Sequence, residues 1–187
     1  MKQHNPPGKG RGATGVLLLG GASRRFGSTK ALATLRGETL AERAWRLLGE
    51  AFGRRLAVGK GGLELPFDVV LEPAEPQAPI VGVVAGLRAV ATDVAVFLPV
   101  DCPLVTPELL RALAEAGAVV PTGPLPGAYA TGDLPELEGR LASGSYSLRG
   151  VNPRVLDVDP RLLANVNTPA DLSAVEEHLA TRDRDEA

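Results

Sequence analysis

Hydrophobic residues in this chain occur alternately in short, nearly continuous runs and in amphipathic stretches. The runs cover residues 15–19, 55–58, 67–71 and 94–100 and predict strands. The run 94–100 is of the kind that strands buried on both faces show. Helical spacing of apolar residues follows the first run, at Leu40, Ala44, Leu47 and Leu48, and residues 81–91 also predict a helix. Strands that alternate with helices predict an α/β fold in which helices cover both faces of a parallel sheet.

Capping residues mark the start of two further helices. Thr106-Pro107-Glu108 combines an N-cap threonine, a proline at the first helical position and an acid in the first turn. Thr168-Pro169 is followed by Asp171 at the position of a capping-box acid. The intervening region is interrupted by prolines, and we expect in it a strand at 127–131, a helix at 134–142 and a strand at 155–158.

Length and composition predict one domain. The chain has 187 residues, and a typical domain has roughly 100 to 200. We expect a disordered basic leader at 1–14, a folded domain at 15–180 and a charged C-terminal tail at 181–187. The net charge of −2 provides no global basic field for nucleic acid or an anionic membrane, and the apolar runs are too short to span a bilayer. A single cysteine, Cys102, is best accommodated in a reducing cytoplasm.

A glycine-rich loop with three cations follows the first predicted strand, between Gly20 and Lys30. Gly20 and Gly21 allow backbone N–H groups to approach phosphate oxygens, and Arg25 and Lys30 add positive charge. The alternative is a solvated basic turn. Because open parallel sheets bind ligands beyond the carboxyl ends of their strands, the position of the loop favours phosphate binding.

Polar residues also follow the most apolar strand and precede the last helix. Asp101 comes directly after the run 94–100, where a carboxylate suits Mg²⁺, although it could also simply begin a turn before Pro103. Asn165 and Asn167 stand two residues apart, so that on an extended segment both amides face the same side. The alternative role for these amides is to shape the start of the helix.

In this order, the segments GGASRRFGSTK, VDCP and NVNTPADL resemble the MobA-like nucleotidyltransferases, the molybdenum cofactor guanylyltransferase family. The resemblance extends from Val16 to Leu179. The family's first-loop signature is met by Gly20, Gly21, Arg25, Gly27 and Lys30. Its Gly-Pro-Leu-x-Gly element corresponds to 78–82, where alanine replaces the first glycine, and Thr29 replaces the aspartate that usually precedes the loop lysine.

The resemblance implies a single-domain, Rossmann-like three-layer sandwich of the nucleotide-diphospho-sugar transferase type. It also implies transfer of GMP from GTP to molybdenum-bound molybdopterin, with release of pyrophosphate. Arg25, Lys30 and Asp101 would be catalytic, and Asp101 would hold Mg²⁺. The nucleotide and the acceptor would be lined by Leu18, Leu19, Gly20, Gly21, Asn165 and Asn167. The family's two remaining nucleotide contacts fall near Gly59 or Lys60 and at Glu72 or Pro73.

The partners implied are GTP and molybdenum-molybdopterin, together with other cofactor-biosynthesis proteins or apo-molybdoenzymes. Two alternatives remain at this point. One is the same chemistry with another nucleotide, in a cytidylyltransferase or a sugar-phosphate nucleotidyltransferase. The other is a non-catalytic module that binds nucleotide or cofactor and delivers it.

Overall fold

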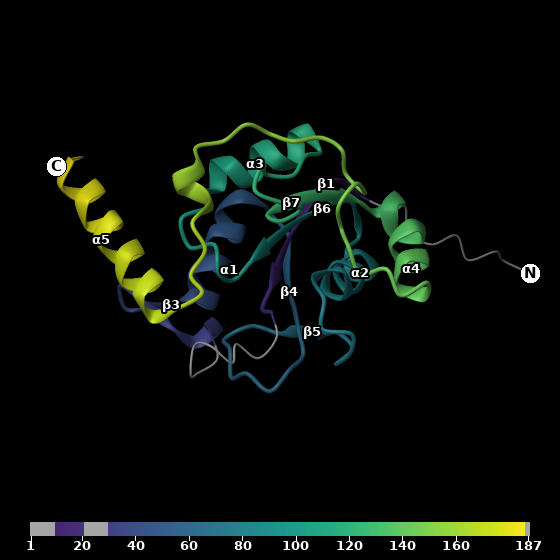
Figure 1. Ribbon diagram of the computed structural model, residues 1–187, viewed down its shortest axis with the longest axis horizontal. Helices are drawn as coiled ribbons and strands as arrows, with labels where there is room; N and C mark the ends of the chain where they lie inside the picture. Colours follow the sequence, from purple (N-terminus) through teal and green to yellow (C-terminus); the bar gives the residue numbers. More distant parts are fainter. Residues whose placement is uncertain (1–9, 21–29, 186–187) are drawn as a thin grey trace, which may run out of the picture.

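The computed structural model describes residues 10–20 and 30–185, which are built around a five-stranded sheet (Figure 1). Its order is β5-β4-β1-β6-β7, with β1 Gly10–Leu18, β4 Arg55–Gly59, β5 Val69–Leu71, β6 Thr92–Pro99 and β7 Gly127–Ala130. β1 pairs in parallel with β4 and β6, and β4 pairs in parallel with β5. Only β7, at the edge, runs antiparallel to its neighbour β6. The prediction of a mostly parallel sheet is confirmed.

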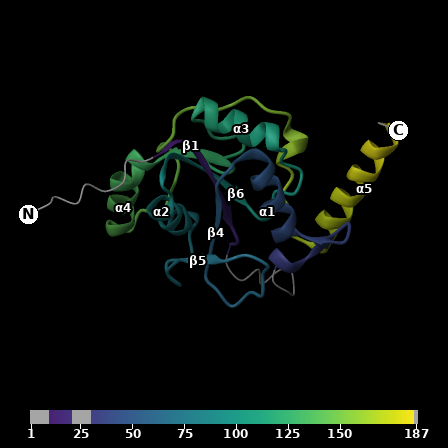
Figure 2. The ribbon, with the colours of Figure 1, turned by 180° about the vertical axis from the view of Figure 1, so that it is seen from behind.

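Helices cover both faces of the sheet (Figures 1 and 2). α1 (Leu40–Ala51) and α3 (Pro107–Ala116) pack together on one face, and α2 (Pro79–Ala89) and α4 (Leu134–Ala142) on the other. Successive residues of β1 serve the two faces, since Leu17 joins the core under α1 and α3 while Val16 joins the core under α2 and α4. This arrangement is the expected three-layer sandwich.

Both predicted capping signals start helices where expected. The Thr106 hydroxyl accepts a hydrogen bond from the Leu109 backbone N–H at 3.3 Å, at the first turn of α3. At α5 (Pro169–Asp185), Thr168 and Asp171 exchange backbone-to-side-chain hydrogen bonds of 2.8 and 3.2 Å in a capping box. The helix predicted at 134–142 coincides with α4.

The boundaries of the leader and of the tail differ from the prediction. β1 begins at Gly10, so residues 10–14 belong to a strand rather than to the leader, and residues 1–9 lie outside the described part. Pairing with β6 is the cause, and it includes a 2.8 Å hydrogen bond between the Thr14 and Thr92 hydroxyls. α5 continues to Asp185, well into the predicted tail, because no glycine or proline follows Pro169 to end it.

Two local predictions were incomplete. Residues 155–158 do not form a strand: Val155 makes only a single bridge to Val119, because Pro153 and Pro160 confine the segment. The small hairpin of β2 (Thr34–Leu35) and β3 (Glu38–Thr39) was not predicted. Its turn residues Arg36 and Gly37 both have positive φ, 54° and 82°, as a type I′ hairpin turn requires. Within the described residues, no helix is long and apolar enough to cross a membrane.

Candidate functional site

A cavity of about 710 Å³ opens at the carboxyl ends of the parallel strands. Its lining includes Leu18, Leu19 and Gly20 at the end of β1, Lys60 after β4, and residues 99–102 at the end of β6. Gly20 has a φ of +71°, a left-handed conformation that glycine adopts without strain. The cavity therefore lies where open α/β sheets bind their ligands.

Lys30 is the centre of a polar cluster in this cavity. Its ammonium lies 3.1 Å from Asp101 Oδ2 and donates a hydrogen bond of 2.9 Å to Asn167 Oδ1. The side chains of Lys30 and Asp101 are 12% and 26% exposed, so the cation is mostly enclosed while the carboxylate keeps access to the cavity. The structure thus brings together three predicted residues that are distant in the chain: Asp101 is 71 positions and Asn167 is 137 positions after Lys30.

Asp101 is held by a turn that contacts the asparagine segment. The Val166 backbone N–H donates to the Asp101 carbonyl oxygen at 2.8 Å, and the Cys102 thiol donates to Asn165 Oδ1 at 3.1 Å. Burial, followed by the negative charge of Asp101, raises the pKa of the Cys102 thiol well above its usual value. Cys102 therefore remains a protonated donor that orients Asn165, and it is poorly suited to act as a nucleophile.

The two predicted asparagines reach the site by different routes. Asn165 lines the cavity, and Asn167 joins the cluster through its hydrogen bond to Lys30. Asp171 Oδ2 accepts from the backbone N–H groups of Asn167 and Thr168, each at 2.8 Å, which fixes the start of α5. These bonds, that from Asn167 first, lower the pKa of Asp171, so the cap remains ionised. The capping box and the Lys30 cluster are thus consecutive parts of one network.

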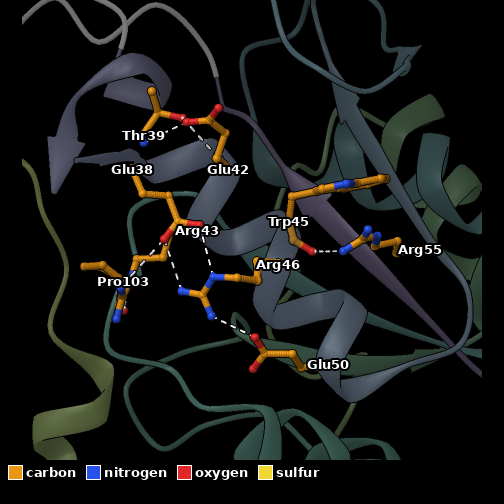
Figure 3. A network of polar contacts seen from close by, with 9 residues as sticks. All are labelled: Glu38, Thr39, Glu42, Arg43, Trp45, Arg46, Glu50, Arg55 and Pro103. Atoms are coloured by element: carbon orange, nitrogen blue, oxygen red, sulfur yellow. Dashed lines mark hydrogen bonds and ion pairs between the residues drawn. The ribbon is translucent and has the colours of Figure 1, made fainter. Parts of the chain in front are cut away.

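A further contact ties the Asp101 turn to α1 (Figure 3). Arg43 Nε donates a 2.8 Å hydrogen bond to the Pro103 carbonyl oxygen, and the Arg43 side chain is only 17% exposed. Burial lowers the pKa of Arg43, which nevertheless stays a cation at neutral pH. The sequence carried no signal for this contact, because Arg43 and Pro103 are 60 residues apart.

Glu72 follows β5 and lines the cavity together with Lys60. Of the two pairs of positions considered for the remaining nucleotide contacts, Lys60 and Glu72 belong to the lining, while Gly59 and Pro73 do not. Desolvation raises the pKa of the half-buried Glu72 carboxyl, and the charge of Lys60 partly opposes this. A Cβ at Gly82 would come within 2.8 Å of Glu72 Oε2, so glycine on α2 leaves the room that this carboxylate occupies.

The donor set at Asp101 fits a cation that shares its coordination with a ligand. The described residues contain no group of three or more His, Cys, Asp or Glu side chains that could hold a metal ion. Mg²⁺ commonly takes one or two carboxylates and completes its octahedron with water and phosphate oxygens. Asp101, with the amide oxygens of Asn165 and Asn167 nearby, supplies hard donors of this kind. Gly21 and Arg25 lie outside the described residues.

Sequence comparison finds similarity over nearly the whole chain. The MobA-like NTP transferase domain family matches residues 15–149. A probable molybdenum cofactor guanylyltransferase of Chloroflexus aggregans is 32% identical, covering 90% of this chain and 95% of its own length. A molybdenum cofactor guanylyltransferase of Cereibacter sphaeroides is 34% identical, with coverages of 88% and 96%.

Solved structures share the fold. The molybdopterin-guanine dinucleotide biosynthesis protein A of Archaeoglobus fulgidus superposes with a TM-score of 0.76 at 23% identity, covering 90% of this chain and 99% of its own. The Rv0371C protein of Mycobacterium tuberculosis, solved in complex with manganese, gives a TM-score of 0.63 at 22% identity, with coverages of 88% and 97%. At these identities the superpositions bear on the fold alone.

Proposed function

The chain belongs to the MobA-like NTP transferase domain family, and from this premise we propose that it transfers GMP from GTP to molybdenum-bound molybdopterin. The observation that carries the proposal is the cluster of Lys30, Asp101 and Asn167 at the carboxyl end of the sheet, beside a cavity large enough for a nucleotide and part of an acceptor. The relatives named as molybdenum cofactor guanylyltransferases cover nearly the full chain, which supports the same activity here.

The reaction forms one P–O bond and breaks another. A terminal phosphate oxygen of the acceptor attacks the α-phosphorus of GTP, and the bond from that phosphorus to the β-phosphate oxygen breaks, so that pyrophosphate leaves. Such a transfer requires alignment and charge neutralisation more than covalent participation by the protein. Lys30, held by Asp101 and Asn167, places a positive charge where the phosphates would lie, and Arg25 and the Gly20–Gly21 backbone would complete the phosphate site.

Asp101 would hold Mg²⁺, and Asn165 and Asn167, whose amide oxygens are held nearby, would contribute to the acceptor side of the cleft. When bound, the cation supplies positive charge against the phosphate oxygens. The Rv0371C protein of Mycobacterium tuberculosis, which shares the fold, was solved in complex with manganese, and this supports a divalent ion in the reaction proposed here. The enclosure of Lys30 keeps its ammonium fixed beside Asp101, and the hydrogen bond from the Cys102 thiol holds the Asn165 amide next to the turn that carries Asp101.

Glu72 offers a basis for choosing guanine. Guanine presents two adjacent N–H donor groups, at its ring nitrogen and its exocyclic amine, and a carboxylate can accept from both. Glu72 is half-buried at the end of the cavity opposite β7, in a position to meet a base whose phosphates lie at Lys30. Cytosine and adenine lack this pair of donors, so an ionised Glu72 favours GTP over CTP and ATP.

Nucleotide-dependent thermal shifts test the choice of substrate. With Mg²⁺ present, GTP should raise the melting temperature more than CTP, ATP or UTP, because stabilisation follows RT ln(1 + [L]/Kd). Equal shifts for all four nucleotides would contradict the guanine assignment. Tight GTP binding without pyrophosphate release in the presence of molybdenum-molybdopterin would instead indicate a non-catalytic protein that delivers nucleotide or cofactor to cofactor-biosynthesis proteins or apo-molybdoenzymes in the cytoplasm.

Asp101→Asn tests the metal assignment. The substitution preserves the shape of the side chain and removes its charge, so Mg²⁺-dependent GTP turnover should fall by more than about tenfold while the melting temperature changes little. Retention of more than about a tenth of wild-type turnover would remove Asp101 as the principal metal ligand. Asp93→Asn, at an exposed position of β6 outside the cavity, is the matched control.

A further inference from the structure

The cavity continues past the Lys30 cluster to the antiparallel edge of the sheet. There it is lined by Thr122, Gly123, Pro124, Leu125, Tyr146 and Leu148, which we call the β7-edge wall. None of these six residues carries a charge, whereas the opposite end of the cavity contains Lys60 and Glu72. The two ends of one cavity therefore suit ligand groups of different chemistry.

The first part of the β7-edge wall is fixed by contacts beneath it. Tyr129 of β7 is 1% exposed, and its hydroxyl donates a 2.9 Å hydrogen bond to the Pro124 carbonyl oxygen. The Val120 N–H donates to the Pro126 carbonyl oxygen at 3.3 Å, and a Cβ at Gly127 would come within 2.6 Å of the Pro124 oxygen. These contacts hold the proline-rich turn in a defined shape.

The second part, the loop that carries Tyr146, is braced from α4. Arg140 Nη1 donates to the carbonyl oxygens of Ser147 and Arg149 at 2.8 and 2.9 Å, and Glu136 holds the same guanidinium at 2.7 Å. Leu148 is 4% exposed and anchors the loop in the core under α2 and α4. Tyr146 therefore lies between anchored residues on a loop of fixed shape.

Tyr146 differs from the other tyrosine in what it does for the fold. Tyr129 is buried and stacks edge-on against Phe97, while Tyr146 is 46% exposed on the cavity. An exposed aromatic ring beside Pro124, Leu125 and Leu148 favours a flat ligand, because such a ligand can stack on the ring and bury its own apolar surface there. Because the wall has no charge to pair with a phosphate, that flat group must be neutral.

We propose that the β7-edge wall binds the planar fused ring of the acceptor, the pterin of molybdopterin, with Tyr146 stacked against it. The inference rests on the proposed function, which places the guanine at Glu72 and the reacting phosphates at Lys30. The strand order β5-β4-β1-β6-β7 then leaves only the β7 side for the acceptor ring. Tyr146 is on this view a residue that determines acceptor specificity.

Steady-state kinetics of Tyr146→Ala separate this role from nucleotide binding. The KM for molybdenum-molybdopterin should rise about fivefold to a hundredfold, the range expected for loss of one stacking contact, while the KM for GTP stays unchanged. Tyr146→Phe, which retains the ring, should restore the acceptor KM. Val155→Ala, at a position 59% exposed and outside the cavity, is the matched control for loss of an exposed apolar side chain.

Direct binding of a fluorescent and uncharged free pterin, 6-hydroxymethylpterin, to the full chain makes the test independent of turnover. Binding to the wild type and to Tyr146→Phe, with at least about fivefold weaker binding to Tyr146→Ala, supports the proposal even if no GMP transfer is detected. In that case only the proposed function would fail. The inference is overturned if Tyr146→Ala raises the KM for GTP instead, which would place the guanine on this ring. It is also overturned if Tyr146→Ala binds pterin as the wild type does.

Discussion

Replacing Arg43 by alanine tests how the turn that carries Asp101 is held. Arg43 Nε donates to the Pro103 carbonyl oxygen at 2.8 Å, and Pro103 is buried, so the substitution leaves that oxygen without its charged donor. A hydrogen bond from a charged group contributes about 1.5–3 kcal/mol. For a chain of this size, a loss of about 2 kcal/mol corresponds to a melting temperature lower by about 4–8 °C. GTP turnover should fall as well, because Asp101 is two residues from the freed carbonyl.

Arg46 on the same helix provides the matched control (Figure 3). It contacts two carboxylates, Glu38 at 3.1 Å and Glu50 at 2.8 Å, and these hydrogen bonds strongly raise its pKa. Its side chain is 45% exposed, however, and exposed ion pairs contribute about 0–1 kcal/mol. Calorimetric unfolding should therefore show a much smaller loss for Arg46→Ala than for Arg43→Ala. Equal losses, or a larger loss for Arg46→Ala, would refute the assignment of the Arg43 bond as an anchor of the turn.

Three other outcomes are expected. Lys30→Ala should weaken GTP binding and slow turnover together, and kinetics equal to the wild type would show that the loop after β1 does not bind phosphate. Gly82→Ala should lower GTP affinity by about fivefold or more, because its Cβ would displace Glu72, whereas Gly139→Ala on α4, where the added methyl meets nothing within 4 Å, should not. GTP affinity measured by calorimetry should decrease as the pH falls toward the raised pKa of Glu72, since the protonated carboxyl no longer accepts two hydrogen bonds. A GTP affinity that does not change with pH would exclude Glu72 from base recognition, and so would a pH dependence that remains in Glu72→Gln.

Structural features that depend only on residues close together in the chain could be predicted from the sequence. The caps at Thr106 and Thr168 act within one helical turn, and the helix at 134–142 follows from local spacing. Asp101 stood out because a carboxylate directly after a buried strand is costly without a role. Glu72 likewise directly follows an apolar run, residues 69–71 of the half-buried edge strand β5, and this position could have selected it over Pro73.

Features that depend on pairing between distant segments were not accessible. Residues 10–14 look like a leader by composition, yet they complete β1 because β6 supplies partners for their backbone. Tyr146 and Arg43 carry no local pattern that assigns them to the cavity or to the Asp101 turn. Their roles arise from loops and helices brought together by the sheet order.

Periodicity and capping act within a few residues, so the alternation of strands and helices, the starts of α3 and α5 and the polar residues at the strand ends follow from the order of residues alone. The contacts of Lys30 with Asp101 and Asn167, and the contrast between an ionisable and a neutral end of the cavity, arise only when the chain is folded. Strand register and sheet order set the distances between residues far apart in the chain, and no local propensity encodes those distances.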